Sequence, residues 1–229
     1  MADTAISTKP ASSLLGLLYL VSPALPIGAF AYSNGLAAAI DLGWVTDETH
    51  LAAWMHGVLT HGLGCLDLPL LARLHAAAAQ GDADIFARWN DTVLASRETA
   101  ELLAEELHLG KALWRLLRDQ TMLPAMVLPK EPGYVAMFAL AATLLEVDTA
   151  ATVQGFVWSW AENQAAVACK TIPLGQTAGQ RVLLGLMPEI SRVAAAATTI
   201  ADDDIGGSLP GLALGSCLHE TQYSRLFRS

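Results

Sequence analysis

One stretch near the start of the sequence restricts the possible folds more than any other: residues 22–36, called the opening segment below. Pro23 and Pro26 each remove a backbone donor and fix φ, so a continuous helix cannot run through them. Gly28 and Gly35 permit backbone conformations that are closed to other residues. The opening segment is therefore predicted to be a kinked, rigid stretch between helices.

The same segment is apolar, and residues 11–40 carry no charge. Phe30, Tyr32 and Ser33 lie between its two glycines. A linker would be polar, and a core helix would lack the prolines. Two interpretations stay open: a surface that another protein covers, or a buried turn between two helices.

Composition indicates more apolar material than one core needs. Hydrophobic residues make up 53 % of the chain and charged residues 15 %, against roughly 25 % charged in a typical soluble domain. A membrane span needs about 20 consecutive apolar residues, and prolines and glycines interrupt the one charge-free candidate, residues 11–40. The pattern favours a chain that other subunits cover and disfavours a membrane protein. A membrane-associated helical protein is the weaker alternative, which solubility without detergent would exclude.

Charge and cysteine content restrict the partners and the compartment. The formal net charge is −9, and no basic stripe is present to neutralise phosphates, so no nucleic-acid partner is expected. Cys65, Cys169 and Cys217 are widely spaced and odd in number. This usage is typical of free thiols in a reducing cytoplasm.

Apolar residues recur with helical periodicity along most of the chain, and no run alternates long enough to predict a strand. We therefore expect an all-α fold, a single-domain bundle of about ten helices of unequal length. The expected organisation is a disordered N-terminal segment (1–10), a helical domain (11–216) and a partner-binding C-terminal tail (217–229).

The clearest long helix is predicted over residues 96–119. Its first turn carries a polar cluster with Arg97 and Glu98. Arg97 and Glu101 are expected to form an exposed i,i+4 ion pair. The cluster is either an ordinary helix start or a functional site.

Signals for catalysis, metal or cofactor binding are missing from the sequence. No glycine pair is followed by the Gly-Lys of a phosphate-binding loop, no Gly-x-Ser-x-Gly elbow occurs, and the six histidines do not pair at helical spacing. Cys217 and His219 are interpreted as a free thiol beside a solvated tail residue, because two groups cannot complete a metal site. Glu105 and Glu106 are interpreted as a solvated helix edge. We expect no cofactor.

The C-terminal tail carries the residue types that anchor protein interfaces, aromatic and arginine side chains together. Tyr223, Leu226 and Phe227 are predicted to share one helical face. Left free, such a tail would be mobile; docked, it would become ordered on a partner. The candidate interface residues of the tail are Glu220, Tyr223, Arg225, Leu226, Phe227 and Arg228.

The order and spacing of these motifs resemble the UreF family of urease accessory proteins. The resemblance covers nearly the whole chain after residue 11. Its motifs are residues 22–30, 32–36, 66–71, 96–102, 172–176 with 179–180, and the tail.

The resemblance implies a dimeric, all-α adaptor in the cytoplasm that is not an enzyme. With the accessory protein UreD (also called UreH) and the GTPase UreG, such an adaptor loads nickel into apo-urease. The opening segment and the tail would then face UreD or the dimer partner. The implied partner-binding residues outside the tail are Pro23, Pro26, Gly28, Phe30, Tyr32, Ser33, Gly35, Arg97, Glu98, Lys170 and Gln176.

Lys170 has two interpretations. It precedes a Pro-Leu-Gly-Gln turn that the resemblance implicates in the GTPase step, and it also reads as an ordinary cation in the last turn of a helix. A second function therefore stays open beside the adaptor: a direct GTPase activator that supplies Arg97 or Lys170 to the transition state, as an arginine finger does. Ala37 and Leu103 replace charged residues that are common in the family, so the resemblance implies no role for a charge at these two positions.

Overall fold

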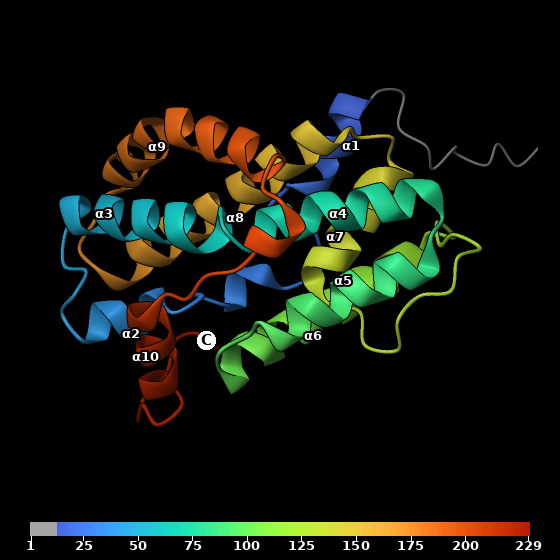
Figure 1. The fold of residues 1–229 in the computed structure, drawn as a ribbon. Helices are drawn as coiled ribbons and strands as arrows, with labels where there is room; N and C mark the ends of the chain where they lie inside the picture. Colours follow the sequence, from blue (N-terminus) through green and yellow to red (C-terminus); the bar gives the residue numbers. More distant parts are fainter. Residues whose placement is uncertain (1–12) are drawn as a thin grey trace, which may run out of the picture.

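The computed structural model describes residues 13–229, which form ten α-helices and no strand (Figure 1). The all-α prediction with about ten helices is confirmed; the disorder expected for residues 1–10 lies outside the described residues. The helices are α1 (Ser13–Leu20), α2 (Leu36–Asp41), α3 (Glu48–Val58), α4 (Asp67–Gln80), α5 (Ala83–Ala95), α6 (Ala100–Asp119), α7 (Tyr134–Leu144), α8 (Thr149–Thr171), α9 (Gln176–Ala197) and α10 (Pro210–His219). Short turns of other helix types cover Ala29–Ala31 (η1), Leu59–Leu63 (η2) and Asp202–Asp204 (η3).

Helix α7 forms the centre of one half of the molecule. Residues 135–142 are each 1 % exposed or less, and α7 packs against α4 and α6. The Phe138 ring meets the Phe156 ring of α8 edge-on, with the ring centroids 5.1 Å apart, an arrangement that aromatic quadrupoles favour. A helix that is apolar on all sides is stable only as a core element of this kind.

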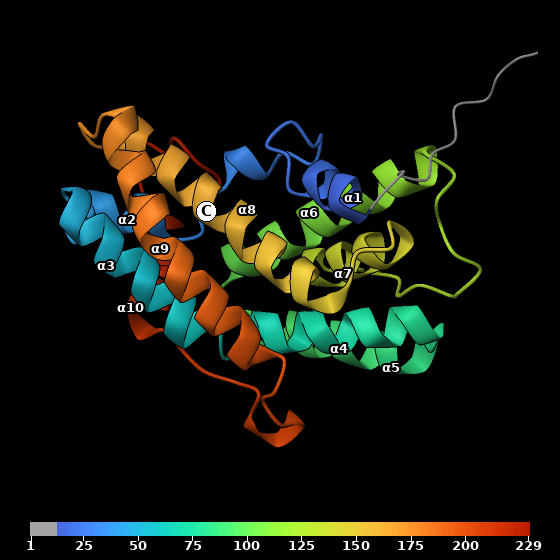
Figure 2. The same ribbon diagram turned by 90° about the horizontal axis from the view of Figure 1, so that it is seen from above.

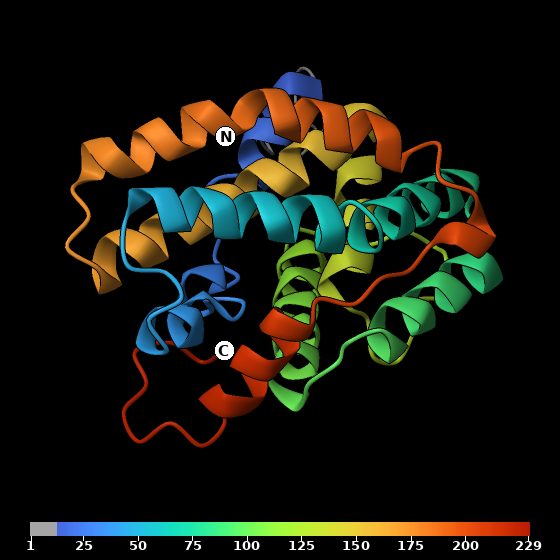
Figure 3. The same ribbon diagram turned by 60° about the vertical axis from the view of Figure 1, so that its left-hand side comes forward.

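The other half is built on α8, which runs between the two groups of helices (Figure 2). Helix α9 packs along α8, and α3 packs on α9. Helix α2 contacts both α8 and α10. In Figure 3, α10 and the end of the chain lie beside the opening segment, although some 200 residues separate them in sequence. Among the described helices none has the length and apolarity needed to cross a membrane.

The prediction that a helix begins at Ser96 is wrong. Helix α6 begins at Ala100, and the hydroxyl of Thr99 caps it by accepting a hydrogen bond from the Leu102 N–H at 3.1 Å. Ser96 instead follows the last residue of α5. Both residues are good N-caps. The later start leaves Arg97 in a loop, where its side chain is free to point into the molecule.

Gly110 brings α6 against the loop that precedes α7. A Cβ atom at this position would overlap the carbonyl oxygen of Pro132 and would lie 2.6 Å from the carbonyl carbon of Gly133. Real Cβ atoms do not approach backbone this closely. The contact between α6 and α7 therefore depends on a residue without a side chain.

Candidate functional site

The opening segment has the backbone that its glycines predict. Gly28 and Gly35 both have φ of 80°, in the left-handed region that favours glycine. At Gly35 a Cβ would also lie 2.6 Å from the Leu212 side chain of α10. Gly35 therefore serves two purposes, because it turns the chain into α2 and lets α10 pack directly against the turn.

Side chains of the opening segment alternate between the interior and the surface. Leu25 and Ile27 are both 8 % exposed, whereas Pro23, Pro26 and Phe30 are exposed, Phe30 at 66 %. The segment is thus neither a wholly buried turn nor a wholly open surface. Its leucine and isoleucine anchor it, and its prolines and phenylalanine face outward.

The C-terminal tail packs on the opening segment. The Arg228 N–H donates to the Ala31 carbonyl at 2.9 Å, and the Ser33 N–H donates to the Ser229 carbonyl at 3.2 Å. The Ser33 hydroxyl donates to the same carbonyl, and the Asn34 N–H donates to the Ser229 hydroxyl at 3.3 Å. In this structure the tail packs on its own chain through these four hydrogen bonds.

The tail is irregular after α10, which ends at His219, so the predicted helical face of Tyr223, Leu226 and Phe227 does not form. Phe227 is only 7 % exposed, whereas Tyr223 and Leu226 are 106 % and 70 % exposed. The tail therefore divides its apolar residues. Phe227 anchors it to the body, and the other two remain on the surface.

Helix α6 holds the tail through two carboxylates one turn apart, Glu101 and Glu105. Glu101 accepts a hydrogen bond from Arg225 at 2.9 Å and one from His219 Nδ1 at 2.7 Å. Glu105 accepts one from the Ser229 hydroxyl at 2.7 Å. The interpretation of His219 as a solvated tail residue is wrong, because it is 1 % exposed. The i,i+4 spacing of the two glutamates was the available sequence signal, since it places both on one face of α6.

Helix α8 holds the opening segment from the other side. Asn163 donates to the Tyr32 carbonyl at 2.8 Å, and Gln164 donates to the Ser33 carbonyl at 2.9 Å. The Tyr32 hydroxyl lies 3.1 Å from His108 Nδ1 on α6. Helix α8 and the tail thus hold the backbone of this turn, and α6 holds the Tyr32 side chain.

Arg97 lies at the centre of a buried charge cluster, not in the exposed pair with Glu101 that was predicted. Its guanidinium donates to Asp67 on α4 and to Glu106 on α6, both at 2.7 Å. Burial alone would lower the pKa of Arg97, but the two carboxylates outweigh that effect and raise the pKa. The other oxygen of Glu106 accepts from the Val135 N–H at 2.8 Å. The cluster therefore joins the beginnings of α4 and α7 to α6.

The interpretation of Glu105 and Glu106 as a solvated edge is also wrong. Glu106 is 6 % exposed and Glu105 is partly buried. Burial raises the pKa of Glu105 to about 7, although hydrogen bonds from Ser229 and Asn34 and the charge of Arg97 oppose the shift. Adjacent acids on a helix are usually solvated, and only tertiary contacts reveal this pair as structural.

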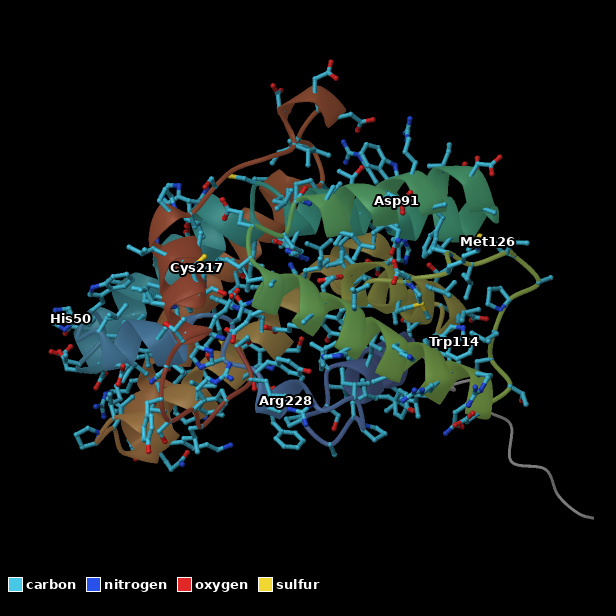
Figure 4. The ribbon with its side chains drawn as sticks, turned by 90° about the horizontal axis from the view of Figure 1, so that it is seen from below. His50, Asp91, Trp114, Met126, Cys217 and Arg228 are labelled. Atoms are coloured by element: carbon cyan, nitrogen blue, oxygen red, sulfur yellow. The ribbon has the colours of Figure 1, made fainter. Side chains whose placement is uncertain are left out.

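Two cavities adjoin these segments. The larger, about 410 Å³, extends among the opening segment, α6, α8 and the start of α9, where Gln176 lines it. The smaller, about 310 Å³, brings four predicted site residues together, Tyr32, Glu220, Arg225 and Arg228. Figure 4 shows Arg228 beside the opening segment.

The remaining predicted residues lie elsewhere. The Glu98 carboxylate accepts from the Ser208 hydroxyl at 2.6 Å and so ties the loop before α6 to the loop before α10. Lys170 is exposed in the last turn of α8. Across residues 13–229, no group of three or more histidine, cysteine or acidic side chains is placed to hold a metal ion.

The fold and the site define the class of protein first: it is an all-helical protein whose charged side chains hold distant segments together and whose large apolar side chains partly face outward. The particular family follows from comparison with known proteins. The family model UreF matches residues 45–187. The urease accessory protein UreF of Chromohalobacter salexigens is 54 % identical over 230 residues, which cover 98 % of this chain and 100 % of that protein. The protein of the same name from Marinobacter nauticus is 54 % identical, covering 95 % of this chain and 94 % of the relative. The chain belongs to the UreF family of urease accessory proteins, which is a non-enzymatic family.

Proposed function

We propose that this chain is an adaptor that joins UreD (UreH) and the GTPase UreG, so that GTP hydrolysis is coupled to nickel insertion into apo-urease. In this proposal it acts in the cytoplasm as a homodimer and meets apo-urease through the complex. Membership of the UreF family supports the proposal.

The observation that carries the proposal is the surface that the opening segment and the tail form together. The tail fixes its own backbone to the opening segment at Ala31 and Ser33, yet it leaves Tyr223 and Leu226 exposed. Phe30 of the opening segment is exposed as well. A rigid backbone that presents aromatic side chains beside arginines has the composition of an interface core.

Helix α1 adds a second apolar surface. Leu14, Leu15 and Leu18 are each more than half exposed, and Tyr19 is 44 % exposed. A typical monomer exposes single, scattered apolar side chains, whereas α1 exposes several large ones within two turns. This clustering supports the proposal that another chain covers α1, either a different protein or the second copy of a homodimer.

We expect the double substitution Tyr223→Ala/Leu226→Ala to weaken UreD binding at least about tenfold, in the range of interface hot spots. Helix content should be unchanged, because neither side chain is buried. Titration of each variant with purified UreD measures the affinity, and circular dichroism of each variant measures the helix content. Deletion of residues 223–229 would be less informative, since it also removes the buried Phe227 and Ser229.

The matched control is Leu184→Ala, which removes an apolar side chain that is 61 % exposed on α9. It should bind UreD as the wild type does. Wild-type affinity of the Tyr223→Ala/Leu226→Ala variant would contradict the assignment of the tail surface to UreD.

A direct GTPase activator is the second candidate function. The exposure of Lys170 favours it, and Lys170 is the one of its two proposed residues that fits the role. Arg97 is held by two carboxylates in the interior, so it does not fit the role of an arginine finger. Lys170 is exposed at the end of α8 and can reach a partner.

If Lys170 acts on the transition state, Lys170→Ala should lower single-turnover GTP hydrolysis by UreG roughly a thousandfold or more while binding is retained, as loss of an arginine finger does. If the chain acts only as an adaptor, Lys170→Ala should lower the rate of GTP hydrolysis only as far as it weakens UreG binding. Single-turnover hydrolysis at saturating adaptor distinguishes the two, with Lys130→Ala as the exposed control.

A further inference from the structure

The exposed side of α6 carries a series of basic side chains, called the α6 basic face below. His108, Lys111, Arg115 and Arg118 follow one another at intervals of three or four residues, and all four are exposed. This spacing places them on one face of the helix. Residues 107–118 contain no acid, although the whole chain has 22 acidic residues and only 13 lysines and arginines. The face is therefore a local concentration of positive charge on an acidic protein.

The stability of α6 does not account for these cations. A helix dipole favours cations only within its last turn, where α6 has Arg118. Arg118 also pairs with Asp119 at 2.8 Å. Lys111 and Arg115 lie further from the end of the helix, and among the described residues no acid forms an ion pair with either.

Surface arginines on other helices are paired within the chain. Arg181 binds Glu48 at 2.6 Å, and Arg192 binds Glu189 at 2.5 Å. The chain thus supplies a carboxylate to exposed cations of α9 and supplies none to the middle of the α6 basic face. Cations that a fold leaves together without counter-charges are available to an outside partner.

The C-terminal tail extends the basic face at its beginning. Arg228 and His108 both line the smaller cavity, of about 310 Å³. Two acids also line it: Glu101, which pairs with Arg225 at 2.9 Å, and Glu220. Arg228 is exposed, and across residues 13–229 no carboxylate forms an ion pair with it. The fold therefore brings a further unpaired guanidinium from the far end of the chain to α6.

Trp114 adds an aromatic side chain to the same helix. The guanidinium carbon of Arg118 lies 4.9 Å from the centre of the Trp114 ring, within the range of a cation–π contact. Figure 4 shows Arg228 near one end of α6 and Trp114 toward the other. Tryptophan and arginine are the residue types that contribute most binding energy at protein interfaces.

We propose that the α6 basic face, together with Arg228, binds an acidic segment of a partner protein. Lys111 and Arg115 are i,i+4 neighbours, whose Cβ atoms lie about 5–6 Å apart, so two carboxylates one helical turn apart on the partner can pair with both. The guanidinium of Arg115 can hold a carboxylate through two parallel hydrogen bonds. This inference rests on the proposed adaptor function and assigns the chemistry of one of its contacts.

A short acidic segment fits this face better than a nucleic acid or a second copy of the chain. The net charge of −9 repels a long polyanion. A short segment meets mainly the local cations, because salt at about 0.1 M screens charges beyond about 10 Å. A contact between the basic face of one copy and an acidic surface of the next is heterologous, so it does not form a closed dimer.

The test is the affinity of purified UreD, UreG and apo-urease, each titrated with the full chain at about 0.1 M and about 1 M salt. We expect Lys111→Glu/Arg115→Glu to weaken binding of one of these proteins at least about tenfold at the lower salt concentration, because like charges then face each other. The wild type should bind that protein more weakly at the higher salt concentration, where the Debye length is only about 3 Å. The variant should show little of this salt dependence.

A milder variant and a control separate this effect from misfolding and from net charge. Lys111→Gln/Arg115→Gln removes the two charges without adding acids, so it should weaken binding of the same protein by a smaller factor. The control Arg88→Glu/Lys130→Glu changes the net charge of the chain by the same amount as Lys111→Glu/Arg115→Glu, at two exposed cations away from α6. It should bind within about twofold of the wild type, as expected for surface charges outside an interface. Circular dichroism of each variant verifies the fold.

Two results would overturn the basic-face proposal alone. One is unchanged affinity of Lys111→Glu/Arg115→Glu for all three proteins, together with weakened UreD binding by Tyr223→Ala/Leu226→Ala. The other is an equal loss in the control, which would assign the effect to net charge. Binding of duplex DNA that only Lys111→Glu/Arg115→Glu abolishes, with the three protein affinities unchanged, would assign the face to nucleic acid instead. A wild-type chain that binds none of the three proteins would overturn the adaptor function and the basic-face proposal together.

Discussion

Replacing Arg97 with methionine is expected to lower the free energy of unfolding by about 3–5 kcal/mol, the usual cost of removing one partner from a buried ion pair. The substitution leaves Asp67 and Glu106 without their cation, and both are less than 10 % exposed. Glu106 also accepts the Val135 N–H at the start of α7, so its displacement disturbs the most buried helix. Equilibrium unfolding in urea at neutral pH measures the effect.

The control for this prediction is Arg118→Met. Arg118 pairs with Asp119 on the surface, where both side chains are at least half exposed, and such pairs contribute about 0–1 kcal/mol. A loss at Arg97 no larger than the loss at Arg118 would show that the cluster does not hold α4, α6 and α7 together.

Gly110→Ala should destabilise the protein by about 3 kcal/mol, at the upper end of the range for overpacking. The added methyl group would meet the backbone of Pro132 and Gly133, and backbone cannot rotate away as a side chain can. Helix α6 would have to move away from the loop before α7. Thermal and chemical unfolding of the variant provide the measurement.

Gly185→Ala is the matched substitution at a helical glycine with open space around it. Gly185 lies inside α9, and a Cβ there has no neighbour within 4 Å. Alanine should therefore stabilise the protein by roughly 0.5–1 kcal/mol through helix propensity. Glycine-to-alanine substitution should thus lower the free energy of unfolding at position 110 and raise it at position 185. Equal effects at the two sites would contradict the close approach of Gly110 to the backbone of Pro132 and Gly133.

Features that depend on local chemistry could be predicted from the sequence. The left-handed backbone at Gly28 and Gly35 follows from the prolines and glycines of the opening segment. The all-α class follows from periodicity alone. Each of these depends on residues a few positions apart.

Features that depend on contacts between distant residues could not be predicted from the sequence. Ser96 and Thr99 are equally good caps by local rules, and the actual start of α6 leaves Arg97 free to reach Asp67, 30 residues away. The tail has a helical pattern of apolar residues, but its end forms no helix and is hydrogen-bonded to Ser33, 196 residues earlier. Tertiary interactions decided both cases against the local preference.

The acids of α6 illustrate the same limit. Neighbouring carboxylates on a helix predict solvent exposure, whereas Glu101 and Glu105 bind the tail and Glu106 binds Arg97 and α7. No single residue of the sequence indicates these roles. Only the i,i+4 spacing of Glu101 and Glu105 placed them on one face, and the partner segments of that face lie at the far end of the chain.

The central claim is that the exposed residues of the opening segment and the tail exist to be covered by other proteins. Native mass spectrometry of this chain mixed with purified UreD and UreG tests it most directly. We expect one complex that contains all three proteins. When Tyr223 and Leu226 are replaced by alanine, we expect this complex to lack UreD. A chain that remains monomeric and unbound at high concentration, with both partners present, would contradict the claim.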